Sequence, residues 1–227
     1  MANVSVVPIS LGFVKAFLVR GEKDILVDAG IAGSGRKILA VLARRGIDPH
    51  MLSLVLVTHG HRDHWGGVRE LLPAISCPIA INARDAEALR SGINPPSQPV
   101  GALMRLLFRG TRAAGTPTLP PLEPGIAFEG TLDLNGYGID GIVEPTPGHT
   151  HGSVSIFLAN SEAIIGDLLR GSFLASGAPR WPFLADDLAE VRRSVSRVLD
   201  RKPVRIWTSH GGPLTPDAVR EFLRRTA

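Results

Sequence analysis

The feature that most constrains this chain is a short cluster of metal-ligand side chains that follows an apolar run. Residues 52–57 (Leu-Ser-Leu-Val-Leu-Val) are apolar and rich in branched side chains, which is typical of a buried strand. Residues 58–64 (Thr-His-Gly-His-Arg-Asp-His) then bring three histidines and one aspartate close together. The pattern predicts that this cluster occupies a strand-to-helix turn, where side chains can converge.

The residue types in the cluster indicate a metal centre. Imidazole nitrogens and carboxylate oxygens are good ligands for zinc and its divalent neighbours. His59 and His61 are two residues apart and share one side of an extended segment. Asp63 and His64 are adjacent, so their side chains diverge. Because four ligands this close in sequence cannot all reach one ion with good geometry, we expect two ions, one for each pair.

Three further stretches place ligand side chains beside a glycine, at or near the end of a predicted strand. They are residues 147–150 (Pro-Gly-His-Thr), 166–167 (Gly-Asp) and 209–211 (Ser-His-Gly). A lone histidine is more often a hydrogen-bonded core or surface residue, but here one arrangement recurs at each place. Asp28 also ends a predicted strand, and is either a hydrogen-bond partner for a ligand or a turn aspartate.

Length and composition are those of a globular protein with one domain. The chain has 227 residues, of which 44% are hydrophobic, enough for a core of two or three layers. No apolar run approaches the roughly 20 residues of a membrane helix, and no signal peptide is evident, so we expect a cytoplasmic protein. The single cysteine, Cys77, excludes an internal disulfide and is expected to be buried.

The charge distribution argues against nucleic acid as a partner. The net charge is only +4, the basic residues are scattered, and the chain has one tyrosine for base stacking. We therefore expect a small-molecule substrate, and neither a nucleic acid nor a membrane.

The remaining patterns predict mixed α and β structure. Alternating residues over 4–20 indicate a strand pair, and residues 154–165 indicate a hairpin. Helical spacing marks residues 34–45 and 187–199, the second with a capping pattern at its start. Residues 204–208 form the last predicted strand.

Residues 92–124 differ in character from the rest of the chain. They contain many prolines and glycines around an apolar core at 100–108 that has a basic flank. We expect an excursion from the fold, a helix flanked by loops. It serves either as a lid over the metal cleft or as a homodimer contact, and the alternative is a surface helix packed on the core.

The motifs at 58–64, 147–150, 166–167 and 209–211 together resemble those of the metallo-β-lactamase superfamily in order and spacing, over nearly the whole chain. The resemblance implies one α+β domain over residues 1–227, built as a four-layer αββα sandwich with two mixed sheets face to face. It also implies two divalent metal ions, with Zn²⁺ as the first choice and iron or manganese as alternatives. The ligands implied by position are His59, His61 and His149 for one metal, Asp63, His64 and His210 for the second, and Asp167 as the bridge.

Asp167 separates the branches of this superfamily. True β-lactamases usually carry cysteine or serine at the matching position, so the aspartate points to the glyoxalase II-like and lactonase-like branches. Only residues 211–227 follow His210, too few for the helical glutathione-binding domain of glyoxalase II. Residues 168–173 lack the tyrosine expected in quorum-quenching lactonases, and the only tyrosine, Tyr137, lies upstream.

The function implied is hydrolysis of an ester, thioester or lactone-type small molecule by a metal-bridged hydroxide. Two cations lower the pKa of water from about 15.7 to roughly 7, so that hydroxide forms near neutral pH. Asp63 and Asp167 are the candidate catalytic residues, which would orient the hydroxide and move its proton. Residues outside the ligand set are expected to contact the substrate, namely Met104, Leu107, Phe108, Arg170, Phe173 and Trp181.

Three other readings of the same motifs stay open. One is a mononuclear iron enzyme that resembles the persulfide dioxygenases, with His59, His149 and Asp167 as its ligands. The second is a phosphodiesterase or nuclease of the same fold, and the third is a metal-stabilised scaffold without catalysis.

Overall fold

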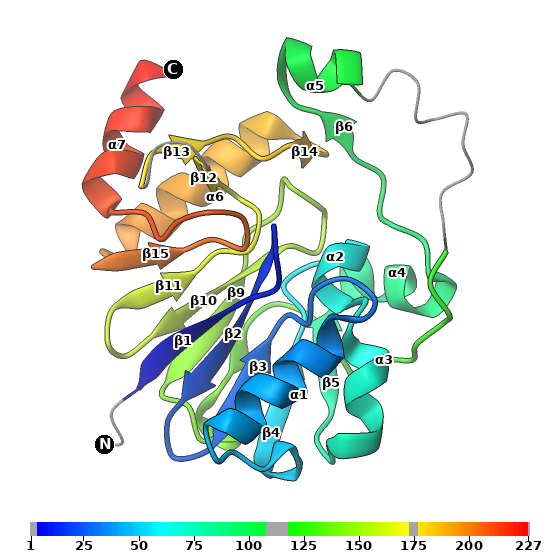
Figure 1. Ribbon diagram of the computed structural model, residues 1–227. Helices are drawn as coiled ribbons and strands as arrows, with labels where there is room; N and C mark the ends of the chain where they lie inside the picture. Colours follow the sequence, from blue (N-terminus) through cyan, green and yellow to red (C-terminus); the bar gives the residue numbers. More distant parts are fainter. Residues whose placement is uncertain (1–3, 108–117, 173–176, 227) are drawn as a thin grey trace.

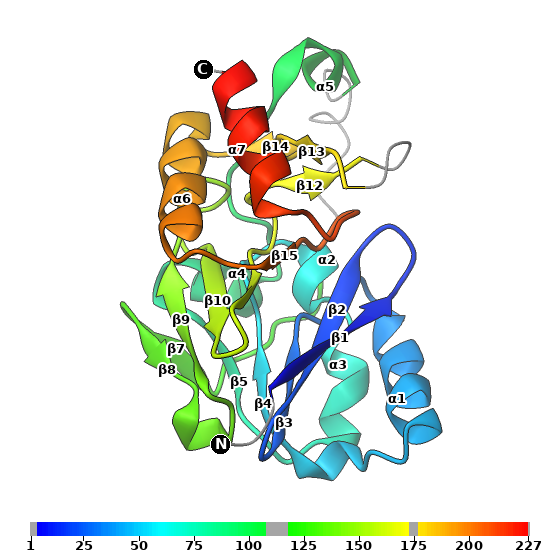
Figure 2. The ribbon, with the colours of Figure 1, turned by 90° about the vertical axis from the view of Figure 1, so that its left-hand side faces the viewer.

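Two β-sheets pack face to face at the centre of the molecule, with helices on both outer sides (Figure 1). The computed structural model describes residues 4–107, 118–172 and 177–226, and the side chain of Leu107 is outside the description. Turned by 90°, the molecule shows the layers in succession, with helices at both sides of the paired sheets (Figure 2). The predicted αββα sandwich is therefore confirmed.

The first sheet is mixed. Its strands are β1 (Ser5–Ser10), β2 (Lys15–Arg20), β3 (Asp24–Val27), β4 (Leu52–Leu56), β5 (Ile79–Asn82) and β7 (Ile126–Phe128), which pair in that order. β2 is antiparallel to both β1 and β3, and β3, β4, β5 and β7 run parallel. Parallel strands end at the same edge of a sheet, which gathers the loops that follow β3 and β4.

The second sheet is antiparallel apart from one edge. Its strands are β15 (Arg205–Trp207), β11 (Glu162–Ile164), β10 (Val154–Leu158), β9 (Gly141–Pro145) and β8 (Leu132–Asp133), again in order of pairing. Only β11 and β15 run parallel to each other. Two further two-stranded sheets lie beyond it, formed by β12 (Arg170–Gly171) with β13 (Pro179–Arg180) and by β6 (Gln98–Pro99) with β14 (Leu184–Ala185).

The α-helices of the described residues divide between the two sheets and the loops. They are α1 (Ser34–Arg44), α2 (Arg62–Trp65), α3 (Val68–Leu71), α4 (Ala86–Ser91), α5 (Gly101–Leu107), α6 (Leu188–Asp200) and α7 (Pro216–Arg225). Buried residues of α1, α3 and α4 pack on the first sheet, and those of α6 and α7 pack on the second. Among the described helices, none combines the length and the apolar character that crossing a membrane requires.

Alternation along the strands separates three hydrophobic clusters. In β3, Leu26 faces α1 and α3, whereas Ile25 and Val27 face the second sheet, because successive side chains of a strand point to opposite faces. A third cluster lies under α6, where Val191 packs with Ile206 of β15. The central strands are buried on both faces, which explains their continuous apolar sequences.

The elements expected from the sequence are present, with small shifts at their ends. The strand expected at 52–57 is β4, the helices expected at 34–45 and 187–199 are α1 and α6, and β10 pairs with β11 as a hairpin. Asp187 caps α6 by accepting hydrogen bonds from the N–H groups of Ala189 and Glu190. Cys77, expected to be buried, is only half-buried.

The excursion at 92–124 is attached to the rest of the molecule by strand pairing. Its β6 pairs with β14, which lies between β11 and β15 in sequence, and α5 then begins at Gly101. Residues 108–117 of the excursion lie outside the described residues. The apolar Leu103 and Leu106 of α5 are 65% and 66% exposed, so the described part of this helix is not packed on the core as a surface helix would be.

Candidate metal centre

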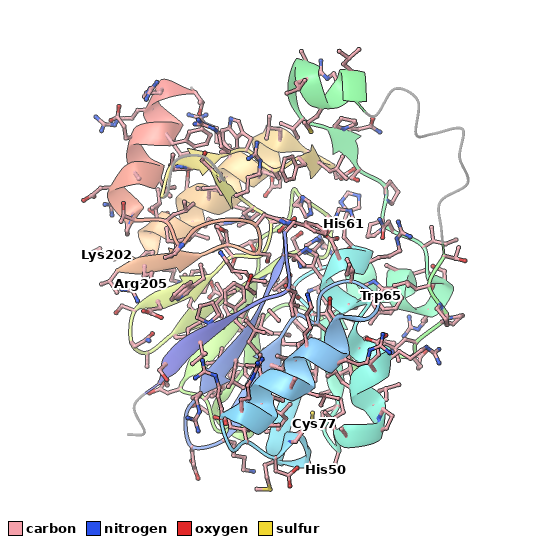
Figure 3. All side chains as sticks on the ribbon, viewed as in Figure 1. His50, His61, Trp65, Cys77, Lys202 and Arg205 are labelled. Carbon is pink, nitrogen blue, oxygen red and sulfur yellow. The ribbon has the colours of Figure 1, made fainter. Side chains whose placement is uncertain are left out.

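Four loops bring the ligand side chains to one end of the sheets. The loop after β4 and the start of α2 carry the cluster 59–64, the loop between β9 and β10 carries His149, and the segments after β11 and β15 carry Asp167 and His210. His61 lies at this end of the molecule, whereas His50 and Cys77 lie at the opposite end (Figure 3). His50 is thus remote from the ligand cluster, in agreement with its absence from the ligand set.

Three histidines form the first group of ligands, which we call the three-histidine site. Nε2 of His149 lies 3.0 Å from Nε2 of His59 and 2.9 Å from Nδ1 of His61, and the latter two atoms are 3.2 Å apart. Tetrahedral zinc with Zn–N bonds of about 2.0–2.1 Å would separate its nitrogens by about 3.3 Å. These three nitrogens therefore have nearly the spacing that a shared ion requires.

Asp63, His64 and His210 form the second group, which we call the mixed site. Oδ2 of Asp63 lies 3.4 Å from Nε2 of His210 and 3.8 Å from Nε2 of His64. Their ligand atoms all lie within 4.8 Å of one another. The structure thus joins Asp63 and His64, the pair expected to share an ion, with a histidine from the far end of the chain.

Asp167 lies between the two sites. Its carboxylate is 3.7 Å from Nε2 of His149 in the three-histidine site. It is also 3.7 Å from Nε2 of His64 and 3.2 Å from Nε2 of His210 in the mixed site. All seven residues expected from the sequence therefore converge, and the Asp167 carboxylate lies within 3.7 Å of ligand nitrogens of both sites.

Hydrogen bonds on the outer side of the imidazoles orient them. Nδ1 of His149 contacts the carbonyl oxygen of Leu184 at 2.7 Å, and Nδ1 of His210 contacts that of Phe13 at 2.8 Å. A carbonyl only accepts, so each Nδ1 carries a proton and Nε2 is the nitrogen that faces the centre. Neither carbonyl acceptor was identified from the sequence, because every residue has a backbone carbonyl and the sequence does not show which one a side chain meets.

Asp28 is a hydrogen-bond partner of a ligand, which settles the two readings left open by the sequence. Its carboxylate lies 2.8 Å from Nδ1 of His64 and accepts from N–H and Oγ1 of Thr58 at 2.8 and 2.9 Å. Asp28 is fully buried and adopts a left-handed backbone with φ of 59°. This conformation, which aspartate tolerates better than most residues, turns the chain at the end of β3.

The two sites differ in electrostatics. Burial holds the pKa of His59 well below its usual range, with the neighbouring His64 adding to this effect, and burial also lowers the pKa of His61, to about 3. At the mixed site, burial works in the same direction, but the nearby Asp167 outweighs it and raises the pKa of His210 to about 10. The three-histidine site is therefore neutral in the metal-free chain, whereas the mixed site holds imidazolium–carboxylate pairs.

The donor set fits divalent metal ions. Among the described residues, buried Nε2 of His64 and Oδ1 of Asp167 have no hydrogen-bond partner, although buried polar atoms are almost always paired. Both atoms point into the cluster, where a cation would satisfy them. Imidazoles together with carboxylates suit zinc, iron and manganese, and three overlapping groups of side chains in this cluster have ligand atoms within 4.8 Å of one another.

A cavity of about 360 Å³ opens above the ligands. Its floor contains His61, Asp63, His149, Asp167 and His210, and its walls are Phe13, Asn94, Met104, Phe183 and Leu184. Phe13, 53% exposed, stacks on the His210 ring with centroids 5.5 Å apart. The sequence analysis missed Phe13, although an exposed aromatic residue in the turn of a strand pair was a signal for it.

The residues expected to contact substrate differ in their positions relative to the cavity. Met104 of α5 lines the cavity. Arg170 does not line the cavity itself. Its guanidinium lies 4.2 Å above the ring of Phe183, and Phe183 is one of the lining residues. Trp181 packs against Phe222 of α7 instead of the cavity, because the strand pair β12–β13 turns it toward the helices. Phe108 and Phe173 lie outside the described residues, as does the side chain of Leu107.

Comparison with known proteins agrees with this geometry. Probable metallo-hydrolase MJ0888 of Methanocaldococcus jannaschii is 29% identical over 200 residues, which cover 86% of each chain. Probable metallo-hydrolase YflN of Bacillus subtilis is 25% identical over 225 residues, covering 89% of this chain and 81% of its own. A metallo-beta-lactamase family protein, TTHA1429, from Thermus thermophilus shares the fold, with a TM-score of 0.67 at 20% identity over 98% of this chain and 79% of its own.

The family itself follows from a match over most of the chain. The model of the metallo-beta-lactamase superfamily covers residues 9–210, a range that contains every ligand named above. With the sandwich, the converging ligands and this match, the chain belongs to the metallo-β-lactamase superfamily.

Proposed function

We propose that this protein is a metal-dependent hydrolase that holds two divalent cations, Zn²⁺ by first choice, and cleaves an ester, thioester or lactone. The observation that carries the proposal is the convergence of seven ligand side chains beneath one cavity with apolar walls. The names of the two curated relatives, both probable metallo-hydrolases, support the reaction class.

Each cation would be held by one of the two groups of ligands described above. His59, His61 and His149 would hold one, the mixed site would hold the other, and Asp167 would contact both. When bound, the cations would polarise the scissile carbonyl and lower the pKa of water from about 15.7 to roughly 7. No protein nucleophile is then required.

Asp63 is the residue we assign to proton transfer. Its side chain is 27% exposed, and the residue lines the cavity, so it can meet water and substrate. Burial would raise the pKa of Asp63, but the neighbouring His64 and a hydrogen bond from His210 outweigh this and lower it to about 2. The carboxylate is therefore ionised at neutral pH and ready to accept a proton at an Oδ atom.

The cavity walls favour a substrate with an apolar part. Phe13, Met104 and Phe183 present apolar surface on different sides of the opening, and Asn94 adds one amide for hydrogen bonding. Because Met104 comes from α5, we assign the excursion at 92–124 the role of a lid. Its dimer-contact role stays an alternative proposal.

The test combines metal quantitation with a hydrolysis screen. The wild type, purified with its metal, should contain two divalent cations per chain and cleave at least one ester, thioester or lactone with an aliphatic or aromatic acyl group. Asp63→Ala should lower kcat by about 10²–10⁴-fold, the usual contribution of a general base.

The matched control is His151→Ala. His151 is two residues from His149, but its side chain is 74% exposed and pairs with Asp186 at 3.2 Å. The control should keep wild-type activity. One iron per chain with oxygen uptake would replace the hydrolase by the dioxygenase reading, and cleavage confined to phosphodiesters would replace it by the nuclease reading. Undiminished activity of Asp63→Ala would remove the mechanism.

A further inference from the structure

Asp85 is a buried carboxylate that lies outside the ligand groups and yet receives three hydrogen bonds. It ends the 3₁₀ turn Ala83–Asp85 after β5 and is only 2% exposed. Its Oδ2 accepts from N–H of Gly60 at 2.7 Å and from Oγ1 of Thr150 at 2.6 Å, and its Oδ1 accepts from N–H of Gly152 at 2.9 Å.

The three donors belong to the two loops that form the three-histidine site. Gly60 lies between His59 and His61, and Thr150 follows His149 directly. The carboxylate therefore joins the loop after β4 to the loop between β9 and β10. These are the loops whose imidazole nitrogens approach to 2.9–3.2 Å. The mixed site has no donor to Asp85 among the described residues.

Close packing around Asp85 leaves room only for glycine at two of the donors. A Cβ at Gly152 would lie 2.6 Å from Cγ of Asp85, and one at Gly60 would lie 2.7 Å from Cβ of Ala88. Real Cβ atoms do not approach other atoms so closely, so a side chain at either position would push the loops apart. Glycine at both positions therefore allows the two loops to approach the Asp85 carboxylate.

We propose that Asp85 is a positioning residue that sets the separation of the two loops and thereby the metal affinity of the three-histidine site. The inference rests on the proposed metal centre. Asp85 touches no ligand atom, and it acts through the backbone of Gly60 and the hydroxyl of Thr150. Groups that orient metal ligands in this way typically contribute about 10–100-fold to affinity.

Asp85→Asn is the sharpest perturbation, because it keeps the shape of the side chain. Both carboxylate oxygens accept hydrogen bonds here, whereas an amide has one oxygen and one NH₂ group. In either orientation the NH₂ faces a donor, which is Gly152 in one case and Gly60 with Thr150 in the other. Each orientation therefore loses at least one backbone hydrogen bond, that of Gly152 or that of Gly60, and weakens the connection between the loops.

The experiment measures metal affinity at each site with Co²⁺ added to the metal-free full chain. Absorption and calorimetric titrations of wild type should give two binding steps. His61→Ala removes a ligand of the three-histidine site only and so identifies its step. Asp85→Asn should weaken that step about 10–100-fold and change the other step by less than threefold. Asp28→Asn, which removes the partner of His64, is the matched control and should weaken the other step instead.

A milder variant covers the case in which Asp85→Asn fails to fold. Thr150→Val removes one of the three hydrogen bonds and should weaken the three-histidine step about 3–10-fold. Equal weakening of both steps, or unchanged affinities with a lower melting temperature, would overturn the inference and leave Asp85 a stabilising residue only. A wild type that binds no divalent metal would overturn the proposed function as well, so the two failures are distinguishable.

Discussion

Replacement of Asp28 by asparagine tests how the mixed site obtains its ligand. The Asp28 carboxylate is fully buried and lies 2.8 Å from Nδ1 of His64. It keeps a proton on Nδ1, so that Nε2 is the nitrogen that would give up its proton to bind a metal ion. Burial lowers the pKa of His64, but Asp28 and then Asp167 outweigh it and hold that pKa well above its usual value.

The asparagine cannot satisfy the same three donors. If its oxygen stays on the N–H of Thr58, its NH₂ faces His64, and the imidazole must then present an unprotonated Nδ1. The proton moves to Nε2, which can no longer bind a metal ion. Asparagine also tolerates the left-handed φ of 59° at this position, so the backbone is not an additional cause of change.

The expected magnitudes follow from these contacts. One or two buried donors lose their acceptor, at about 1–3 kcal/mol of unfolding free energy for the metal-free chain. Metal affinity at the mixed site should fall about 10–100-fold, with the three-histidine site nearly unchanged. Urea denaturation measures the first quantity, and Co²⁺ titration measures the second.

The control is Asp24→Asn, the same substitution at the start of β3. Asp24 pairs with Arg20 at 3.2 Å near the surface, and such exposed pairs contribute at most about 1 kcal/mol. It should leave both metal sites unchanged. Wild-type affinity of Asp28→Asn at the mixed site would refute the reasoning that a tautomer links this carboxylate to the metal centre.

Three further predictions concern protons, substrate and metal removal. The pKa of His210 is raised to about 10 and that of His64 is also raised, so metal binding at the mixed site at pH 7 should release about two protons. The metal affinity of this site should therefore rise with pH. Calorimetry in buffers of different ionisation enthalpy counts the released protons, and the absence of release would contradict the protonated state of these histidines. Met104→Ala should raise KM for long-chain acyl substrates about tenfold, because burial of such a side chain contributes roughly 1.5–3 kcal/mol. KM for acetyl esters and the melting temperature should stay unchanged. Equal KM changes for both substrates would show that Met104 does not contact the acyl chain. Chelation should lower the free energy of unfolding by about 2.7 kcal/mol for each site that had been occupied at 100 times its Kd, and an unchanged denaturation midpoint would show that metal does not stabilise the fold.

Local sequence accounts for much of the fold. The apolar runs that became β3 and β4 are buried on both faces, and α1 and α6 have the helical spacing that predicted them. Such patterns arise from the repeat of the backbone itself, so they are visible without tertiary contacts. The ligand chemistry is also visible in the local sequence, because the residue types of the cluster at 59–64 by themselves indicate a metal centre.

The details of the site required the tertiary structure. Trp181 and Met104 both looked like substrate contacts, yet Trp181 lies against Phe222 and only Met104 lines the cavity. The sequence patterns singled out neither Asp85 nor Phe13, since each lies in a short connection after a strand. Their roles depend on which loops lie beside them, and one sequence carries no record of that.

What this sequence determined by itself is the kind of chemistry and the family of folds, since both reside in residue types and in spacing along the chain. The tertiary structure decided which nitrogen of each imidazole faces the centre and which carboxylates stand behind the ligands. It also decided which apolar residues form the walls of the cavity. The reason is physical: these properties depend on distances between loops that strand order alone brings to one edge of the sandwich.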